Sequence, residues 1–120
     1  MKALPLIFAA ALLAAPASAQ VAPARELSLE HRMMLRCSAA FALVAHRQET
    51  GDVAMQQYPP LKERGSKYFV HASAKVMEQA GLDRPAITAA LETEARTLLQ
   101  GQTLAAIMPV CLSALDAAGL

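Results

Sequence analysis

The chain has 120 residues with 11 basic and 10 acidic side chains, two cysteines and a formal net charge of +1. A chain of this length suits one compact domain and leaves no room for two. A charge so close to zero gives no general attraction for nucleic acid or for an anionic membrane surface, so we expect neither as a partner.

The first residues have the three parts of a cleavable secretory signal. Lys2 gives a positive start, an apolar run fills residues 3–15, and small residues follow. The apolar run is shorter than the roughly 20 residues that a membrane-spanning helix needs, so a retained membrane anchor is the less favoured alternative. Signal peptidase requires small side chains at the last and third-last positions before its cut, and Ala17 and Ala19 supply them. We therefore predict a signal-peptide helix in residues 1–19, cleaved after Ala19, and a periplasmic or secreted mature protein without a stable membrane anchor.

Cys37 and Cys111 are the only cysteines of the chain. An even cysteine count in an exported chain predicts a disulfide, because the compartments beyond the membrane are oxidising. Their spacing does not match a Cys-x-x-Cys redox motif, a zinc knuckle or a haem attachment site. We therefore expect one structural disulfide, with two buried free thiols as the alternative.

Residues 20–27 contain a proline and are expected to form a flexible arm ahead of a single helical domain in residues 28–120. Apolar residues at steps of three and four predict a first helix near 29–50, between a cap at Ser28 and a stop at Gly51. The middle of this helix, from Ser38 to Ala45, is apolar nearly all round, which predicts that neighbouring helices cover it.

A second helix is predicted near 60–80, because the consecutive Pro59 and Pro60 prevent a helix from running through them and Gly81 follows the apolar stripe. Pro60 suits the first turn of that helix, where its missing N–H does no harm. Gly65 lies inside the apolar stripe of this helix. Glycine lowers helix propensity by about 1 kcal/mol relative to alanine, so its presence indicates either a close helix crossing or a late helix start.

Asp83 is predicted to cap a third helix that has Pro85 in its first turn and ends near Gly101. A fourth helical segment follows, and Pro109 must either begin or kink it. Four amphipathic helices with short connections favour an all-α up-down bundle. In such a bundle the first and last helices are antiparallel neighbours, so a disulfide between their two cysteines would tie them together.

The sequence carries no recognisable catalytic or metal-binding motif. His31, His46 and His71 show no metal-ligand spacing, so we expect no metal site and no other cofactor. The chain also lacks Gly-x-Ser-x-Gly, Ser-x-x-Lys and His-Glu-x-x-His, which are typical of hydrolases. We therefore expect no catalytic residues and a protein that is not an enzyme.

The most distinctive polar segment combines two tyrosines with three basic residues. Tyrosine and arginine are favoured anchors at protein interfaces. We therefore predict a partner-docking surface formed by Tyr58, Lys62, Arg64, Lys67 and Tyr68. The alternative is a loop that leads into a helix with an ordinary charged face.

These features together favour a non-enzymatic periplasmic binding or protective protein that acts through protein contacts, either chaperone-like or immunity-like. Its expected partner is another periplasmic protein, and the sequence does not determine the oligomeric state. The alternative is a small-molecule or metal carrier that uses the interior of the bundle.

Overall fold

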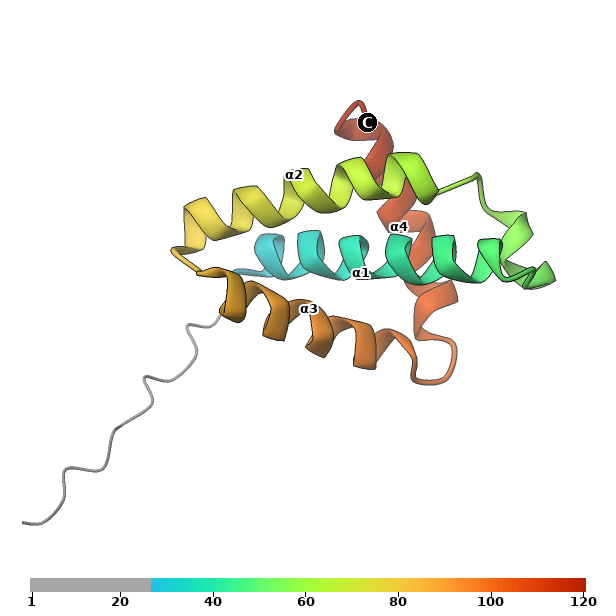
Figure 1. The fold of residues 1–120 in the computed structure, drawn as a ribbon, viewed down its shortest axis with the longest axis horizontal. Coiled ribbons are helices and arrows are strands. Elements are labelled where there is room, and N and C mark those ends of the chain that lie inside the picture. The colour runs from blue at the N-terminus through green and yellow to red at the C-terminus, as the bar shows by residue number, and fades with distance from the viewer. Residues whose placement is uncertain (1–26) are drawn as a thin grey trace, which may run out of the picture.

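The computed structural model of the protein describes residues 27–120. The predicted signal peptide of residues 1–19, its cleavage after Ala19 and all but the last residue of the arm of residues 20–27 lie outside the described residues. Within the described residues the chain is all-α and compact, with four α-helices and one short 3-10 helix (Figure 1). This confirms the predicted all-α class and the predicted number of helices.

In chain order, the elements are α1 (Leu29–Glu49), the 3-10 helix η1 (Val53–Gln57), α2 (Lys62–Ala80), α3 (Arg84–Leu98) and α4 (Thr103–Ala117). No helix in residues 27–120 is both long and apolar enough to cross a membrane.

Three helix boundaries follow the local signals in the sequence. The side chain of Ser28 accepts a hydrogen bond from the His31 N–H at 3.1 Å, and this caps α1. Asp83 caps α3 in the same way, by accepting from the Ala86 N–H at 2.9 Å. Gly81 ends α2 with a φ of 66°, a left-handed conformation that favours glycine. The predicted cap residues are therefore confirmed.

One prediction about a proline needs correction, and one alternative that the sequence left open is decided. Pro60 lies before α2 rather than in its first turn, because the fully buried Leu61 separates it from the first helical residue, Lys62. Leu61 is the N-cap residue of α2, and its N–H donates to the Gln48 side chain at 3.2 Å, which anchors this cap to α1. Pro109 lies inside α4, so the alternative in which it begins the helix is excluded.

The helices do not form the up-down bundle expected from the sequence. Figure 1 shows α1 between α2 and α3, the three running side by side, while α4 passes behind α1 and crosses it steeply. Because α2 and α3 already flank α1, a helix laid along α1 would reach fewer neighbours than one laid across it. The crossing helix α4 contacts α1, α2 and α3.

The predicted disulfide is present and joins α1 to α4. Cys37 and Cys111 are bonded, with their Cα atoms 5.1 Å apart and both residues buried. The two helices meet where they cross. The sequence predicts antiparallel neighbours along their whole lengths, and this part of the prediction is wrong. The disulfide thus ties the first helix to the last at the crossing point.

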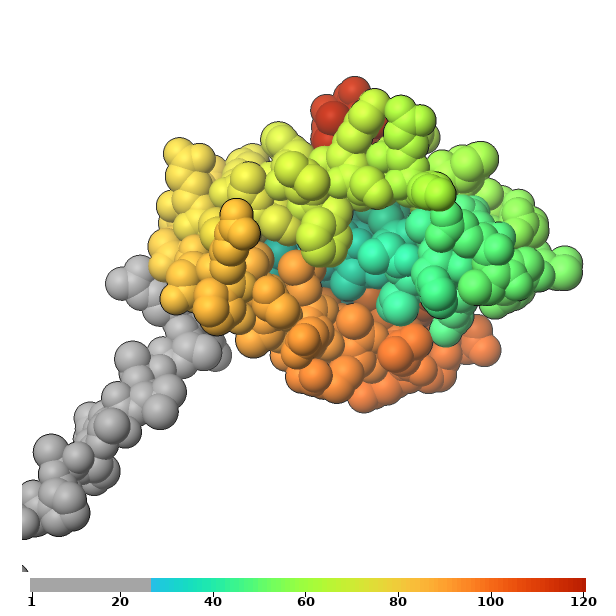
Figure 2. All heavy atoms as spheres, viewed as in Figure 1, coloured from blue at the N-terminus to red at the C-terminus, as the bar shows by residue number. Residues whose placement is uncertain are grey.

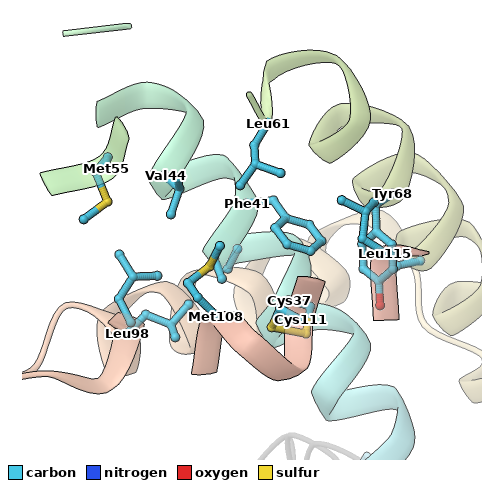
Figure 3. Close-up of a cluster of buried hydrophobic side chains, with 14 residues drawn as sticks. Cys37, Phe41, Val44, Met55, Leu61, Tyr68, Leu98, Met108, Cys111 and Leu115 are labelled. Atoms are coloured by element: carbon cyan, nitrogen blue, oxygen red, sulfur yellow. A yellow bond between two sulfur atoms is a disulfide. The ribbon is translucent and has the colours of Figure 1, made fainter. Parts of the chain in front are cut away.

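The main hydrophobic core surrounds Phe41, which is fully buried on α1. Figure 3 shows its ring next to Leu61 and the Cys37–Cys111 disulfide, and facing Tyr68. The Phe41 and Tyr68 ring centroids are 5.2 Å apart at an interplanar angle of 86°, an edge-to-face contact. Each fully buried large apolar side chain contributes about 1.5–3 kcal/mol. The core also contains Val44, Met55, Leu98, Leu104, Met108 and Leu115.

The segment between α1 and α2 is held by the side-chain amide of Gln48. Its Nε2 donates to the backbone carbonyls of Met55 at 3.1 Å, Tyr58 at 3.3 Å and Pro59 at 3.1 Å. Its Oε1 accepts from the Leu61 N–H. One side chain of α1 therefore satisfies backbone groups on both sides of the two prolines.

Candidate functional site

The predicted docking residues do not share one exposed surface. Tyr68 is 5% exposed and belongs to the core, and Tyr58 is half-buried. Tyr68 is three residues from Gly65 and four from Ala72, both buried, which places it on the inner face of α2. The prediction that Tyr68 lies on a docking surface is therefore wrong, and helix periodicity is the physical reason.

The three basic residues of the predicted surface lie on α2, and each is paired within the chain. Lys62 Nζ lies 2.7 Å from the Glu49 carboxylate, and this pair lowers the pKa of Glu49 and raises that of Lys62. Lys67 Nζ lies 3.3 Å from Glu63, one helical turn away. These pairs are exposed, so each contributes little to stability.

The third basic residue, Arg64, links α2 to the end of the described chain. Its Nη2 lies 2.8 Å from Asp116 Oδ1, and its Nε donates to the Leu120 backbone oxygen at 2.9 Å. Arg64 therefore has a structural role in holding the end of α4 against α2.

The structure instead shows an apolar trough on the face that α4 does not cover. Figure 2 shows α1 at the bottom of this trough, between α2 and α3. Two adjoining hollows of about 290 Å³ and about 170 Å³ share the side chains of Ala42 and Phe69. We call the two hollows together the α1 trough. Its lining residues from the three helices include Ala39, Ala42, Leu43, Ala45 and His46 of α1, Ser66, Phe69 and Val70 of α2, and Leu91, Glu92 and Ala95 of α3.

The composition of α1 explains why the trough is open. Ala39, Ala42 and Ala45 place small side chains at its floor, so the helix surface lies low between its neighbours. On the α2 side, Phe69 is half-buried and Val70 is 69% exposed. The prediction that neighbouring helices cover the apolar middle of α1 is therefore correct for its inner side and wrong at Ala42, which is exposed.

Charged side chains border the trough on both sides. On α2, Lys67 and His71 line a further hollow of about 400 Å³ together with Ser66 and Val70, which also line the trough. On α3, Glu92 lines the trough itself. The α2 border therefore carries the basic residue Lys67, and the α3 border carries the acidic residue Glu92.

The buried charged group of the described residues has a structural role. No group of three or more histidine, cysteine or acidic side chains in residues 27–120 is arranged to hold a metal ion. The buried Glu94 carboxylate accepts a hydrogen bond from Arg36 Nε at 2.7 Å. This pair joins α1 to α3 and neutralises a charge that would be costly to bury alone.

The sequence contained two signals for the trough. The alanines at its floor belong to the uniformly apolar middle of α1, and Phe69 and Val70 directly follow Tyr68.

No protein-family model, curated protein or solved structure matches the chain.

Proposed function

We propose that this protein is a non-enzymatic binding protein that acts through protein contacts, and that the α1 trough is the place where its partner binds. The observation that carries the proposal is the exposed apolar surface of the trough, which three helices build. Val70 is 69% exposed there, above the alanines of α1. Contiguous exposed apolar surface bordered by polar residues is typical of protein interaction sites.

The location of the hollows favours protein contacts over a small-molecule carrier. A carrier that uses the bundle interior needs space inside the core, but Phe41 and Met108 are fully buried among core side chains. The hollows of the trough open at the surface, where a protein surface can reach them. The proposal does not depend on a cofactor.

The proposal places the protein in the periplasm or another compartment beyond the membrane. The motif of residues 1–19 and the Cys37–Cys111 disulfide support this, because stable disulfides persist in oxidising compartments. A chaperone-like protein would bind many partners in the trough, and an immunity-like protein would bind one.

Site-specific photo-crosslinking tests the proposal. A photo-reactive amino acid replaces Val70 in the full chain, which is then expressed in the cells that normally produce it. The matched control carries the same group at Val53, an equally apolar residue that is 83% exposed on η1 and outside the trough. We expect covalent adducts from position 70 and none from position 53, with mass spectrometry identifying the adducts.

The Ala42→Glu substitution adds a second control, because it places a charge at the floor of the trough on an exposed position. We expect it to remove the adducts from position 70 while the melting temperature changes little. One adduct would favour the immunity-like function and many would favour the chaperone-like function. Equal adducts from positions 53 and 70, or none from position 70, would contradict the proposal.

A further inference from the structure

We infer that the partner fills the α1 trough with a single amphipathic α-helix, whose apolar stripe is flanked by acidic side chains on one side and by basic side chains on the other. This inference rests on the proposed function, because it specifies the partner of the same trough. The backbone chemistry of the trough, its length and the charges on its two borders all favour such a helix.

The lining of the trough favours a helix over an extended peptide. Its walls are three α-helices, whose backbone N–H and C=O groups are bonded within each helix. The polar side chains that line it in the described part of the chain are those of Ser66, His46 and Glu92. An extended peptide would give up backbone hydrogen bonds to water and find few replacements. A helix satisfies its own backbone and can bury an apolar stripe here.

The length of the trough also suits a helix. Its floor includes Ala39, Ala42, Leu43 and His46, which follow one another at steps of three, one and three on α1. At 1.5 Å per residue these positions span about 10 Å, or two helical turns. Two turns of a docking helix present apolar residues at positions i, i+3, i+4 and i+7 on one face. The alanines at the floor allow that face to approach α1 closely.

The borders of the trough carry opposite charges. Lys67 lies on the α2 side, in the hollow next to the trough, and Glu92 lines the trough on the α3 side. Lys67 is already paired with Glu63, but the two side chains are 60% and 83% exposed, so this weak pair can be exchanged for one with a partner. A docking helix is therefore favoured when acidic residues face α2 and basic residues face α3. Border charges of this kind set orientation and selectivity more than total affinity.

Synthetic peptides test the inference on the full-length mature protein. Four peptides of equal length carry the same leucine stripe at helical spacing. The first has one acidic and one basic flank, the second has two acidic flanks, and the third has two basic flanks. The fourth is the first peptide with a central proline, which breaks the helix. Affinities are measured by fluorescence anisotropy at low and high salt.

We expect the first peptide to bind most tightly and the proline peptide to bind at least about tenfold more weakly, because proline strongly disfavours a helix interior. The first peptide should bind about two- to fivefold more tightly than the second and third, as expected for exposed ion pairs. This difference in affinity should become smaller at high salt. Lys67→Glu makes both borders acidic and should transfer the preference to the peptide with two basic flanks. Glu92→Lys should transfer it to the peptide with two acidic flanks.

Val70→Glu and Val53→Glu establish where the peptides bind. Val70→Glu should abolish binding, and Val53→Glu, on η1, should not change it. Equal affinity for the proline peptide, or no change of preference in the charge variants, would overturn the inference while leaving the proposed function intact. Absence of binding by all four peptides would also overturn it, and the photo-crosslinking experiment would then decide the proposed function separately.

A second copy of the chain is the other occupant that the test can reveal. If analytical ultracentrifugation shows a dimer that Val70→Glu converts to a monomer, the trough is filled by the protein itself and the inference is overturned. A wild-type monomer that binds the first peptide with the expected charge preference supports it.

Discussion

Gly65 of α2 lies so close to Phe41 of α1 that a Cβ atom at position 65 would come within 3.0 Å of the Phe41 Cβ. The same atom would lie 3.6 Å from the Leu61 Cβ. Gly65 lies inside α2 rather than before it, so the close helix contact, and not a late helix start, explains the glycine. Because Gly65 and Phe41 both line the trough, this contact also positions α2 as one of its walls.

Gly65→Ala should destabilise the protein, although alanine is the better helix former. The added methyl group meets the Cβ of a fully buried residue, which can move little without shifting α1. Overpacking of this kind costs about 1–3 kcal/mol, and the gain in helix propensity is about 1 kcal/mol. We expect a net loss of about 1 kcal/mol in the free energy of unfolding, measured by urea denaturation.

Ala74→Gly is the matched control for Gly65→Ala, because Ala74 is exposed on the same helix. A substitution there changes the helix propensity and leaves the packing of the core unchanged. Ala74→Gly should lower the free energy of unfolding by about 1 kcal/mol. If Gly65→Ala proved more stable than the wild type, Phe41 would have to yield to the methyl group, and the close contact would not be the reason for the glycine.

Removal of the disulfide should cost more than any single substitution considered for this protein. The bond closes a loop between residues 74 positions apart, and on the chain-entropy model such a loop stabilises a fold by about 4 kcal/mol. We expect the Cys37→Ala, Cys111→Ala double variant to lose about that much in urea denaturation. Reduced wild-type protein should show a similar loss, and an unchanged midpoint in both samples would contradict a stabilising role.

The helices and their ends could be predicted because their determinants are local. Ser28 and Asp83 cap helices with their own side chains, and Gly81 supplies the left-handed residue that ends α2. The disulfide followed from the number of cysteines and the predicted compartment. The caps do not depend on how the helices are arranged in space, and the disulfide requires only that α1 and α4 meet at one point.

The arrangement of α4 and the candidate site could not be predicted in the same way. An apolar stripe shows that a helix is buried, but it does not show whether the helix lies along its neighbour or across it. The two cysteines are compatible with both arrangements, since a single bond fixes one point of contact. The trough arises because α4 covers one side of α1 and leaves Ala42 exposed on the other, so it depends on that arrangement.

Gln48→Glu should loosen the segment between α1 and α2. The carboxylate has the same shape as the amide and can still accept from the Leu61 N–H. It cannot donate to the carbonyls of Met55, Tyr58 and Pro59, and its charge would lie against them. We expect a loss of about 1–3 kcal/mol and faster hydrogen exchange in residues 53–61.

Gln57→Glu is the control for that substitution, because Gln57 is exposed and its amide donates to one carbonyl, that of Ala54, at 2.9 Å. It should change stability by less than about 0.5 kcal/mol, as is usual for surface substitutions. Equal effects of the two substitutions would show that the position of Gln48 has no special importance.

Burial of Tyr68 should make the protein sensitive to alkaline pH. Burial disfavours the charged phenolate and raises the pKa of Tyr68 above its ordinary value of 10.0. The unfolded chain therefore releases this proton at a lower pH than the folded chain does. The contribution to stability is complete below about pH 10 and is lost as the pH rises from there through the raised folded pKa. The wild-type protein should thus lose stability above pH 10.

Tyr68→Phe isolates this effect, because phenylalanine keeps a ring to pack edge-on against Phe41 and has no ionisable hydroxyl. The variant should resemble the wild type in urea denaturation at pH 7 and should be less destabilised on going from pH 9 to pH 11. Tyr58→Phe removes the hydroxyl of the other tyrosine, which is only half-buried, and controls for the loss of any tyrosine. If Tyr68→Phe and the wild type lost the same stability between pH 9 and pH 11, ionisation of Tyr68 would not be coupled to unfolding.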